Sequence, residues 1–201
     1  MSDIIFDTIS KGFAGQPVLR DISDLLPREG TAALMGPSGS GKTTFTRLLL
    51  GLEKPDAGTI TGNEGLRFSC VFQEDRLVEE LSALDNEALV LARPRLAALR
   101  RAFAAVGLLE EDLHKPVRAL SGGQRRRVAL VRALEAESDY LVLDEALKEL
   151  DADNHALCME YLQNRRGARG LLLVTHNPAE AAVCSQTIQL PAPPETPPQV
   201  Q

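Results

Sequence analysis

The segment from Gly36 to Thr43 constrains this chain more than any other, because it reads Gly-Pro-Ser-Gly-Ser-Gly-Lys-Thr. Its spacing, G-x-x-x-x-G-K-S/T, is that of a phosphate-binding loop. An apolar run of strand type lies before it, at residues 31–35, and a helix-like segment follows it, at residues 44–50. This order of strand, loop and helix favours a phosphate site over a simple Gly/Ser turn.

In such a loop, successive backbone N–H groups point into one concavity at a helix N-terminus, where the peptide dipoles also favour negative charge. Glycines are needed because a Cβ would block the approach of a phosphate. Lys42 can then reach the outer phosphates, and the Thr43 hydroxyl is placed to be an oxygen ligand of Mg²⁺. We therefore expect a bound nucleotide here.

Composition excludes several classes of protein. The chain has 201 residues, of which 44% are hydrophobic, and this suits one domain with a proper core. The formal net charge of -6 argues against a dedicated nucleic-acid surface. No apolar run approaches the length of a bilayer span and no signal-peptide pattern opens the chain, so we expect a cytosolic protein, at most docked on a membrane. Cys70, Cys158 and Cys184 are widely spaced and are expected to be free thiols.

Hydrophobic periodicity predicts the remaining elements. The opening segment alternates apolar and polar residues around Gly12, Gly15 and Pro17, which indicates short antiparallel strands. Two more strands are expected at residues 59–61 and 66–72.

A mostly helical insertion follows, and its basic residues are expected on a solvated face: Arg93, Arg95, Arg100 and Arg101. We place one domain at residues 1–190, with a helical subdomain at about 84–119. Residues 191–201 are Pro-rich and are expected to form a disordered tail.

Two carboxylates, Asp144 and Glu145, follow the apolar run 140–143, which is typical of a strand buried in a parallel sheet. The carboxyl end of such a strand faces the crevice where ligands bind in open α/β sheets. Asp144 can therefore hold Mg²⁺, directly or through water, and Glu145 can take a proton from an attacking water.

The stretch Leu-Ser-Gly-Gly-Gln at residues 120–124 indicates a helix start capped by Ser121, and hence a second candidate anion site. The basic triplet at residues 125–127 is expected on the surface of that helix. Another buried strand is expected at residues 171–175, with His176 at its end, and the last strand at residues 186–190.

The order of these pieces resembles that of the ATP-binding cassette (ABC) ATPases over residues 1–190. The pieces are the phosphate loop, Gln73 after a strand, L-S-G-G-Q, an apolar run ending in Asp-Glu, and a strand followed by His176. The resemblance implies an α/β fold: a phosphate-loop (RecA-like) ATPase core with an antiparallel β subdomain and a helical insertion.

The resemblance also implies roles for single residues. The ATP phosphates would be held by Gly36, Pro37, Ser38, Gly39, Ser40, Gly41, Lys42, Thr43 and Thr44. Phe13 would stack on adenine, and Thr43, Gln73 and Asp144 would lie at Mg²⁺. The γ-phosphate of ATP held by the opposite subunit would meet Ser121, Gly122, Gly123 and Gln124. Catalysis would use Glu145 as general base, His176 to orient the γ-phosphate and water, and Lys42.

Members of this family work as head-to-tail dimers that close around two ATP molecules and drive a permease on the cytoplasmic face of the membrane. The stretches 71–77 and 175–181 look most like importers of nitrate, sulfonate or thiamine-like solutes. We therefore expect ATP and Mg²⁺ as ligands. The expected partners are a second cassette, in a homodimer, and a transmembrane permease, and we expect no nucleic acid.

Three departures from the family pattern concern hydrolysis. Ala146 stands where Pro is usual, Lys148 where Ser or Thr is common, and Asn177 where Asp is common. These changes favour one alternative, an ATP-dependent interaction module with impaired hydrolysis, although Glu145 and His176 are retained. A cytosolic ABC ATPase not coupled to transport stays open as a second alternative.

Overall fold

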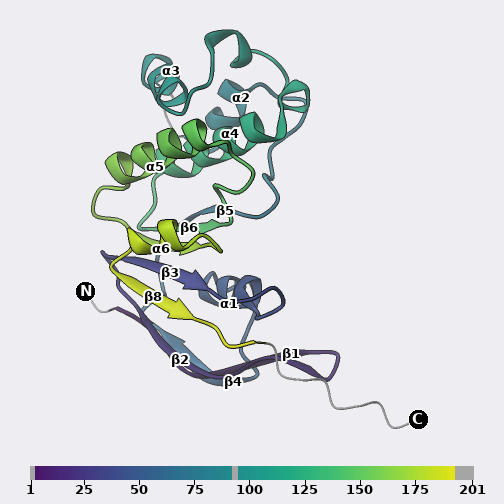
Figure 1. Ribbon diagram of the computed structural model, residues 1–201, viewed down its shortest axis with the longest axis vertical. Helices are drawn as coiled ribbons and strands as arrows, with labels where there is room; N and C mark the ends of the chain where they lie inside the picture. Colours follow the sequence, from purple (N-terminus) through teal and green to yellow (C-terminus); the bar gives the residue numbers. More distant parts are fainter. Residues whose placement is uncertain (1–2, 92–94, 193–201) are drawn as a thin grey trace. The chain divides into compact units, whose positions relative to one another are not determined.

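The computed structural model describes residues 3–91 and 95–192, and the chain falls into two compact units (Figure 1). The first unit combines residues 1–66 with residues 170–201, and the second comprises residues 67–169. Arg93 and residues 193–201 of the expected tail lie outside the described residues.

An antiparallel sheet in the first unit has the order β2-β1-β4. Its strands are β1 (Ile4–Phe13), β2 (Gln16–Leu26) and β4 (Ala57–Thr61). The first two have 10 and 11 residues, so the expectation of short strands is wrong. The physical reason is that bulges, such as the register shift between Phe6 and Ile9, interrupt the alternation without ending the strand.

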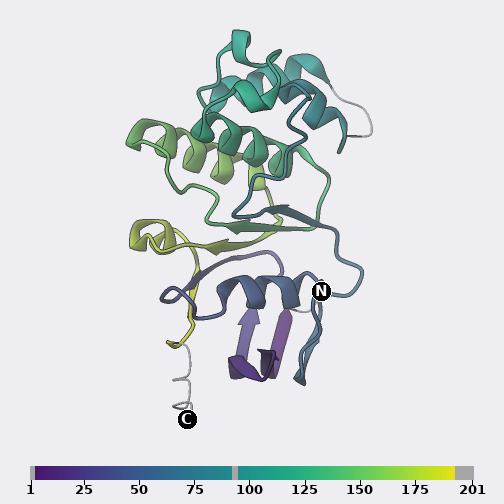
Figure 2. The same cartoon turned by 90° about the vertical axis from the view of Figure 1, so that its right-hand side faces the viewer.

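The first unit also holds three parallel strands in the order β7-β3-β8. They are β3 (Thr31–Met35), β7 (Gly170–Val174) and β8 (Gln186–Gln189). Every residue of β7 is buried, as expected for a continuous apolar run in a parallel sheet. Helix α1 (Lys42–Leu49) lies between these strands and the antiparallel sheet, and α6 (Pro178–Ala182) packs against β3 (Figures 1 and 2).

Aromatic stacking joins α1 to the antiparallel sheet. The rings of Phe6 on β1 and Phe45 on α1 lie 4.2 Å apart between centroids, with an interplanar angle of 13°. Both side chains are almost fully buried, so this contact sits at the centre of the core of the first unit.

The second unit is built around α4 (Gly122–Glu135), which packs against β5 (Phe68–Val71) and three further helices. These helices are α2 (Ala83–Ala88), α3 (Leu96–Ala105) and α5 (Ala152–Arg166). Strand β5 pairs in parallel with β6 (Tyr140–Asp144), whose five residues are all buried. Two short 3-10 helices, Glu110–Asp112 and Val117–Ala119, complete the unit.

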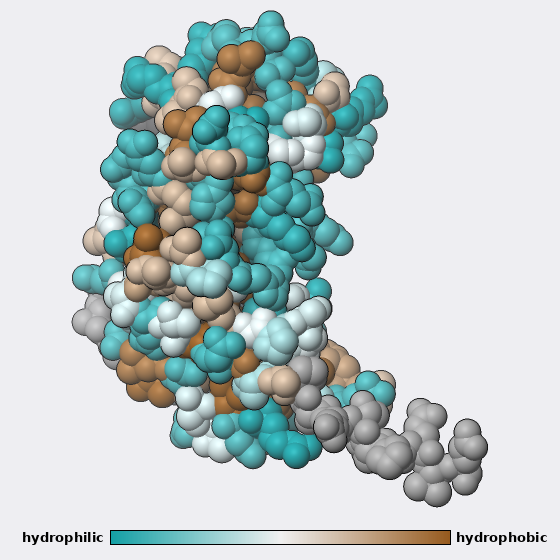
Figure 3. Space-filling view, in the orientation of Figure 1, coloured by the Kyte–Doolittle hydropathy of each residue, from teal (hydrophilic) through white to brown (hydrophobic). Residues whose placement is uncertain are grey.

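The surface agrees with several expectations drawn from composition. Figure 3 shows hydrophilic residues over most of one face, with hydrophobic residues in several separate patches. Arg95, Arg100 and Arg101 are exposed, as predicted. All three cysteines are free thiols, which confirms that prediction. Among the described residues, no helix combines the length and apolar character needed to cross a bilayer.

Candidate functional site

The phosphate loop joins β3 to α1 in the first unit. Lys42 is the first residue of α1, and its Nζ donates hydrogen bonds to the carbonyl oxygens of Gly36 at 2.8 Å and Pro37 at 3.0 Å. The residue is only 8% exposed, so its ammonium group is held inside the loop. Phosphate oxygens would compete with these two carbonyls for the same N–H donors.

Two glycines make this loop sterically possible. Gly36 has a φ of 156°, and a Cβ on it would come within 2.6 Å of Ser40 Oγ. Gly41 has a φ of 91°, and a Cβ there would come within 2.6 Å of the Leu19 side chain. Gly41 is also the N-cap residue of α1 and offers no side-chain cap, so the first N–H groups of that helix are available to an anion.

Ser40 supports the assignment of the loop to an anionic ligand. Its hydroxyl oxygen is buried, at 2% exposure for the residue, and has no hydrogen-bond partner among the residues that the structure describes. A buried hydroxyl without a partner is costly, and a ligand in the loop would relieve that cost.

The first unit also carries Phe13 and His176. Phe13 is the last residue of β1 and is 42% exposed. His176 is exposed and follows β7, as the sequence predicts. Its loop is shaped by Thr175, whose hydroxyl accepts from Asn177 N, and by Asn177, whose Oδ1 caps α6 by accepting from Ala179 N.

In the second unit, Asp144 ends β6 and is 4% exposed, and Glu145 follows in a backbone conformation with a φ of 51°. A positive φ is uncommon for a residue other than glycine and often marks a functional turn. Lys148 Nζ lies 3.0 Å from Glu145 Oε2, and the Lys148 side chain is 52% exposed. The lysine that departs from the family pattern therefore contacts the predicted general base directly.

The prediction that the basic triplet lies on a helix surface is wrong for two of its three residues. Arg126 and Arg127 are each only 7% exposed. Long basic side chains can be buried where several acceptors converge, and backbone carbonyls from distant segments meet both guanidinium groups here.

Arg126 joins the Gln73 loop to Glu145, which sequence reasoning missed. Its Nη1 donates to Phe72 O at 2.7 Å, Gln73 O at 3.1 Å and Asp75 Oδ1 at 3.0 Å. Its Nη2 donates to Glu145 O at 2.7 Å. In the sequence, this arginine is marked only by its place one turn into the helix that starts within L-S-G-G-Q. Its acceptors lie 19 to 54 residues away, so the sequence did not predict them.

The L-S-G-G-Q segment closes on itself as a capping box. Ser121 Oγ accepts from Gln124 N at 3.2 Å, and Gln124 Oε1 accepts from Ser121 N at 2.8 Å, which confirms Ser121 as the N-cap. The amide of Gln124 also donates to Asp112 Oδ2 at 2.8 Å. Gln124 thus holds Ser121 in place. Gly122, which is exposed, and Gly123, which is half-buried, are the first residues of the helix.

Within the second unit, three of the predicted segments meet at one hollow of about 210 Å³. It is lined by residues of the Gln73 loop, by Gly122 and Gly123, and by Lys148. The structure therefore brings Gln73, the L-S-G-G-Q segment and the Lys148 loop together.

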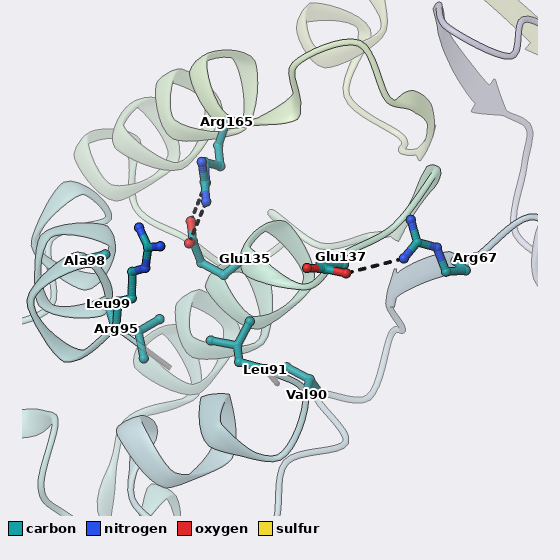
Figure 4. A pocket seen from close by; sticks show the side chains of 9 residues that line it. All are labelled: Arg67, Val90, Leu91, Arg95, Ala98, Leu99, Glu135, Glu137 and Arg165. Atoms are coloured by element: carbon teal, nitrogen blue, oxygen red, sulfur yellow. Dashed lines mark hydrogen bonds and ion pairs between the residues drawn. The ribbon is translucent and has the colours of Figure 1, made fainter. Parts of the chain in front are cut away.

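A larger pocket, of about 720 Å³, lies elsewhere in the second unit and contains none of the predicted site residues (Figure 4). Four of its charged side chains form two pairs: Arg165 contacts Glu135, and Arg67 contacts Glu137 at 3.4 Å. Arg95 is a further charged residue of the lining. Leu99 and other apolar side chains line the rest of the wall. Since its two carboxylates are already engaged by arginines, and none of the predicted site residues lines it, we assign no ligand to this pocket.

Comparison with known proteins gives the family. The sequence pattern of the ABC transporter family matches residues 19–148. The taurine import ATP-binding protein TauB of Pseudomonas aeruginosa is 39% identical in an alignment of 200 residues that covers 90% of this chain and 75% of TauB. The aliphatic sulfonates import ATP-binding protein SsuB of Escherichia coli is 37% identical over 197 residues, which cover 93% of this chain and 76% of SsuB.

Solved structures share the fold. The dimeric structure of MJ0796, described as a bacterial ABC transporter cassette, has a TM-score of 0.80 at 24% identity and covers 94% of each chain. A post-hydrolysis state of MJ0796 bound to ADP and Pi has a TM-score of 0.78 at 24% identity, covering 93% of this chain and 94% of that one. The predicted α/β phosphate-loop fold with an antiparallel β subdomain is confirmed. The family pattern over residues 19–148 and the relatives at 37% and 39% identity show that the chain belongs to the ABC transporter family.

Proposed function

We propose that this chain binds and hydrolyses ATP as the energy-supplying subunit of an importer of small solutes. The observation that carries the proposal is the phosphate loop. Its lysine is buried against the loop carbonyls at 2.8 and 3.0 Å, and its helix N-terminus lacks a side-chain cap. Such a loop suits the phosphates of a nucleotide, and the residues from Gly36 to Thr44 would surround them.

The donor set fits Mg²⁺. The Thr43 hydroxyl, the Gln73 amide oxygen and the Asp144 carboxylate are hard oxygen donors of the kind that Mg²⁺ prefers. When bound, the ion would neutralise charge on the phosphates. Asp144 lies at the end of β6 and is 4% exposed.

In hydrolysis, Glu145 would take the proton of the attacking water, His176 would orient that water and the γ-phosphate, and Lys42 would offset charge on the transferring group. Most of the rate enhancement would come from positioning and charge stabilisation. The hydrogen bond that Arg126 Nη2 donates to the backbone carbonyl oxygen of Glu145, at 2.7 Å, would hold the main chain of the base.

A second cassette would complete the site, in a dimer of two copies of this chain. Ser121, Gly122, Gly123 and Gln124 would meet the γ-phosphate of ATP held by the partner. Support comes from the exposure of Gly122 at the start of α4, next to the capping box, and from the description of MJ0796 as a dimer.

The importer assignment follows from the relatives named for taurine and aliphatic sulfonate import. We infer a small organic solute, a transmembrane permease as partner, and a place on the cytoplasmic face of the membrane. The net charge of -6 favours this role over one on nucleic acid.

One observation favours a second candidate function, an ATP-dependent interaction module with slow hydrolysis. Lys148 engages an oxygen of the predicted base at 3.0 Å, and an engaged carboxylate is a weaker proton acceptor.

Steady-state ATP hydrolysis by the purified chain with Mg²⁺, across protein concentration, tests both functions. A rate that rises faster than linearly with protein and vanishes in Glu145→Gln is the expected result. ATP binding without turnover at any concentration would favour the second candidate. A membrane fraction that retains the chain with a permease would support transport, whereas recovery with nucleic acid would contradict it.

A further inference from the structure

Phe13 has a cation against its ring. Lys11, two residues earlier on β1, places Nζ 5.2 Å from the centroid of the Phe13 ring. The Lys11 side chain is only 13% exposed, whereas Phe13 is 42% exposed. A cation at this distance is attracted by the π face of the ring.

Asp56 holds this cation in place. Its Oδ1 accepts from Lys11 Nζ at 2.9 Å, and its Oδ2 accepts from Gly12 N at 2.8 Å. Asp56 N in turn donates to Ser10 O at 2.9 Å. The hydrogen bonds from Gly12 and Lys11 hold the pKa of Asp56 below its usual value. The Asp56 carboxylate therefore binds Lys11 and Gly12, and its backbone N–H binds Ser10, the residue before them.

The same stretch of β1 lies beside the phosphate loop. Lys11 pairs with Leu19 across the hairpin, and Leu19 is the side chain that a Cβ on Gly41 would strike. Lys11, Phe13 and Gly41 all belong to the first unit. A nucleotide whose phosphates are held at Gly41 would therefore bind in the same unit as Lys11, Asp56 and Phe13.

We propose that Lys11 and Asp56 are positioning residues that hold the Phe13 ring for stacking on the base of the nucleotide. The inference rests on the proposed function, in which Phe13 stacks on adenine. The ammonium group lies against the ring and draws its electron density, while the exposed part of the ring is left for a purine. Asp56 keeps the ammonium group from turning toward solvent.

Binding by the full chain to two probes tests this inference: ATP, which carries a base, and inorganic tripolyphosphate, which does not. Isothermal titration with Mg²⁺ should show that Lys11→Met weakens ATP binding about threefold to fivefold, since a cation–π contact of this kind is modest. Asp56→Asn should weaken it about twofold. Neither change should alter tripolyphosphate binding.

Arg20→Met is the matched control. Arg20 is an exposed cation on the same hairpin, and like Lys11 it lines a hollow of about 400 Å³. Like Lys11→Met, the substitution Arg20→Met removes one positive charge from the lining of this hollow. An equal loss of ATP affinity in Arg20→Met and Lys11→Met would overturn the proposal, because the effect would then be general electrostatics.

A double substitution separates positioning from folding. In a Phe13→Ala background, Lys11→Met should weaken ATP binding no further, because the ring it serves is gone. A further loss there, or a parallel loss of tripolyphosphate binding, would overturn the inference. If Phe13→Ala alone left ATP affinity unchanged, the stacking role would fail while the phosphate site stood. If Lys42→Ala left ATP binding unchanged, the proposed function itself would fail.

Discussion

Lys148 donates from Nζ to Glu145 Oε2 over 3.0 Å, three residues along the same loop. The Glu145 side chain is 12% exposed and that of Lys148 is 52% exposed. Lys148 therefore contacts the predicted general base from the solvent side, and a substitution of this exposed lysine can test the contact.

Removing this lysine should speed hydrolysis. An exposed ion pair contributes about 0 to 1 kcal/mol, so Lys148→Ser should raise Glu145-dependent turnover by up to about fivefold. Turnover of ATP at saturating Mg²⁺ measures this, and Lys148→Arg, which keeps the charge, serves as the control. A lower rate in Lys148→Ser would show that the lysine supports the base instead of restraining it.

Glu145→Gln should bind ATP with little change and lose at least about 100-fold in turnover, since a positioned base typically contributes 10²- to 10⁴-fold. Quench-flow or steady-state phosphate release measures the rate, and titration measures the affinity. Closed dimers should accumulate with ATP in gel filtration. Turnover at the unsubstituted rate would remove Glu145 from the base role.

Lys42→Ala should abolish useful ATP binding, because the loop then loses the buried ammonium group that Gly36 O and Pro37 O hold. Circular dichroism should show an unchanged fold. Retained micromolar binding would mean that the backbone amides of the loop suffice.

Arg126→Met should lower the free energy of unfolding by about 2–4 kcal/mol, because four acceptors, Asp75 Oδ1 among them, lose the donors of a buried guanidinium group. Urea unfolding measures the change. Arg118→Met is the control, since Arg118 is exposed. Equal effects in the two variants would contradict a special role for Arg126.

Glu87 makes stability depend on pH. It is fully buried in α2, its carboxylate oxygens have no hydrogen-bond partner among the described residues, and burial raises its pKa to about 8. The unfolded chain loses this proton near pH 4.5, whereas the folded chain keeps it to about pH 8. Stability should therefore fall as pH rises between these values.

Glu87→Leu should remove most of that dependence and raise the melting temperature at pH 8 by at least about 4 °C, given 2–4 °C per kcal/mol for a chain of this size. Melting followed by circular dichroism at pH 5, 6.5 and 8 measures it. The exposed Glu80→Gln is the control. If the unsubstituted protein melted at the same temperature at all three pH values, the raised pKa of Glu87 would be contradicted.

Local sequence was sufficient wherever neighbouring residues decide the structure. The apolar runs at 31–35 and 140–143 became strands β3 and β6, because a continuous apolar run is stable only when buried on both faces. Ser121 became an N-cap because its partner Gln124 lies three residues away.

Contacts between residues far apart in the chain could not be predicted from the sequence. The antiparallel strands β1 and β2 are longer than predicted, since cross-strand pairing carries them through bulges that look like breaks. Arg126 was predicted on the surface, yet its acceptors Phe72 and Gln73 lie 54 and 53 residues away in the chain.

By itself, the sequence determined the glycine-rich loop at residues 36–43 and the two buried strands, one ending at Asp144 and the other shortly before His176. It also determined the family, because each family motif is made of residues close together in the chain. Only the tertiary structure decided that Lys11 lies against Phe13 and that Arg126 is buried. The same holds for the contact of Lys148 with Glu145. Side-chain partners are set by which surfaces the fold brings within hydrogen-bond distance, and spacing along the chain does not contain that information.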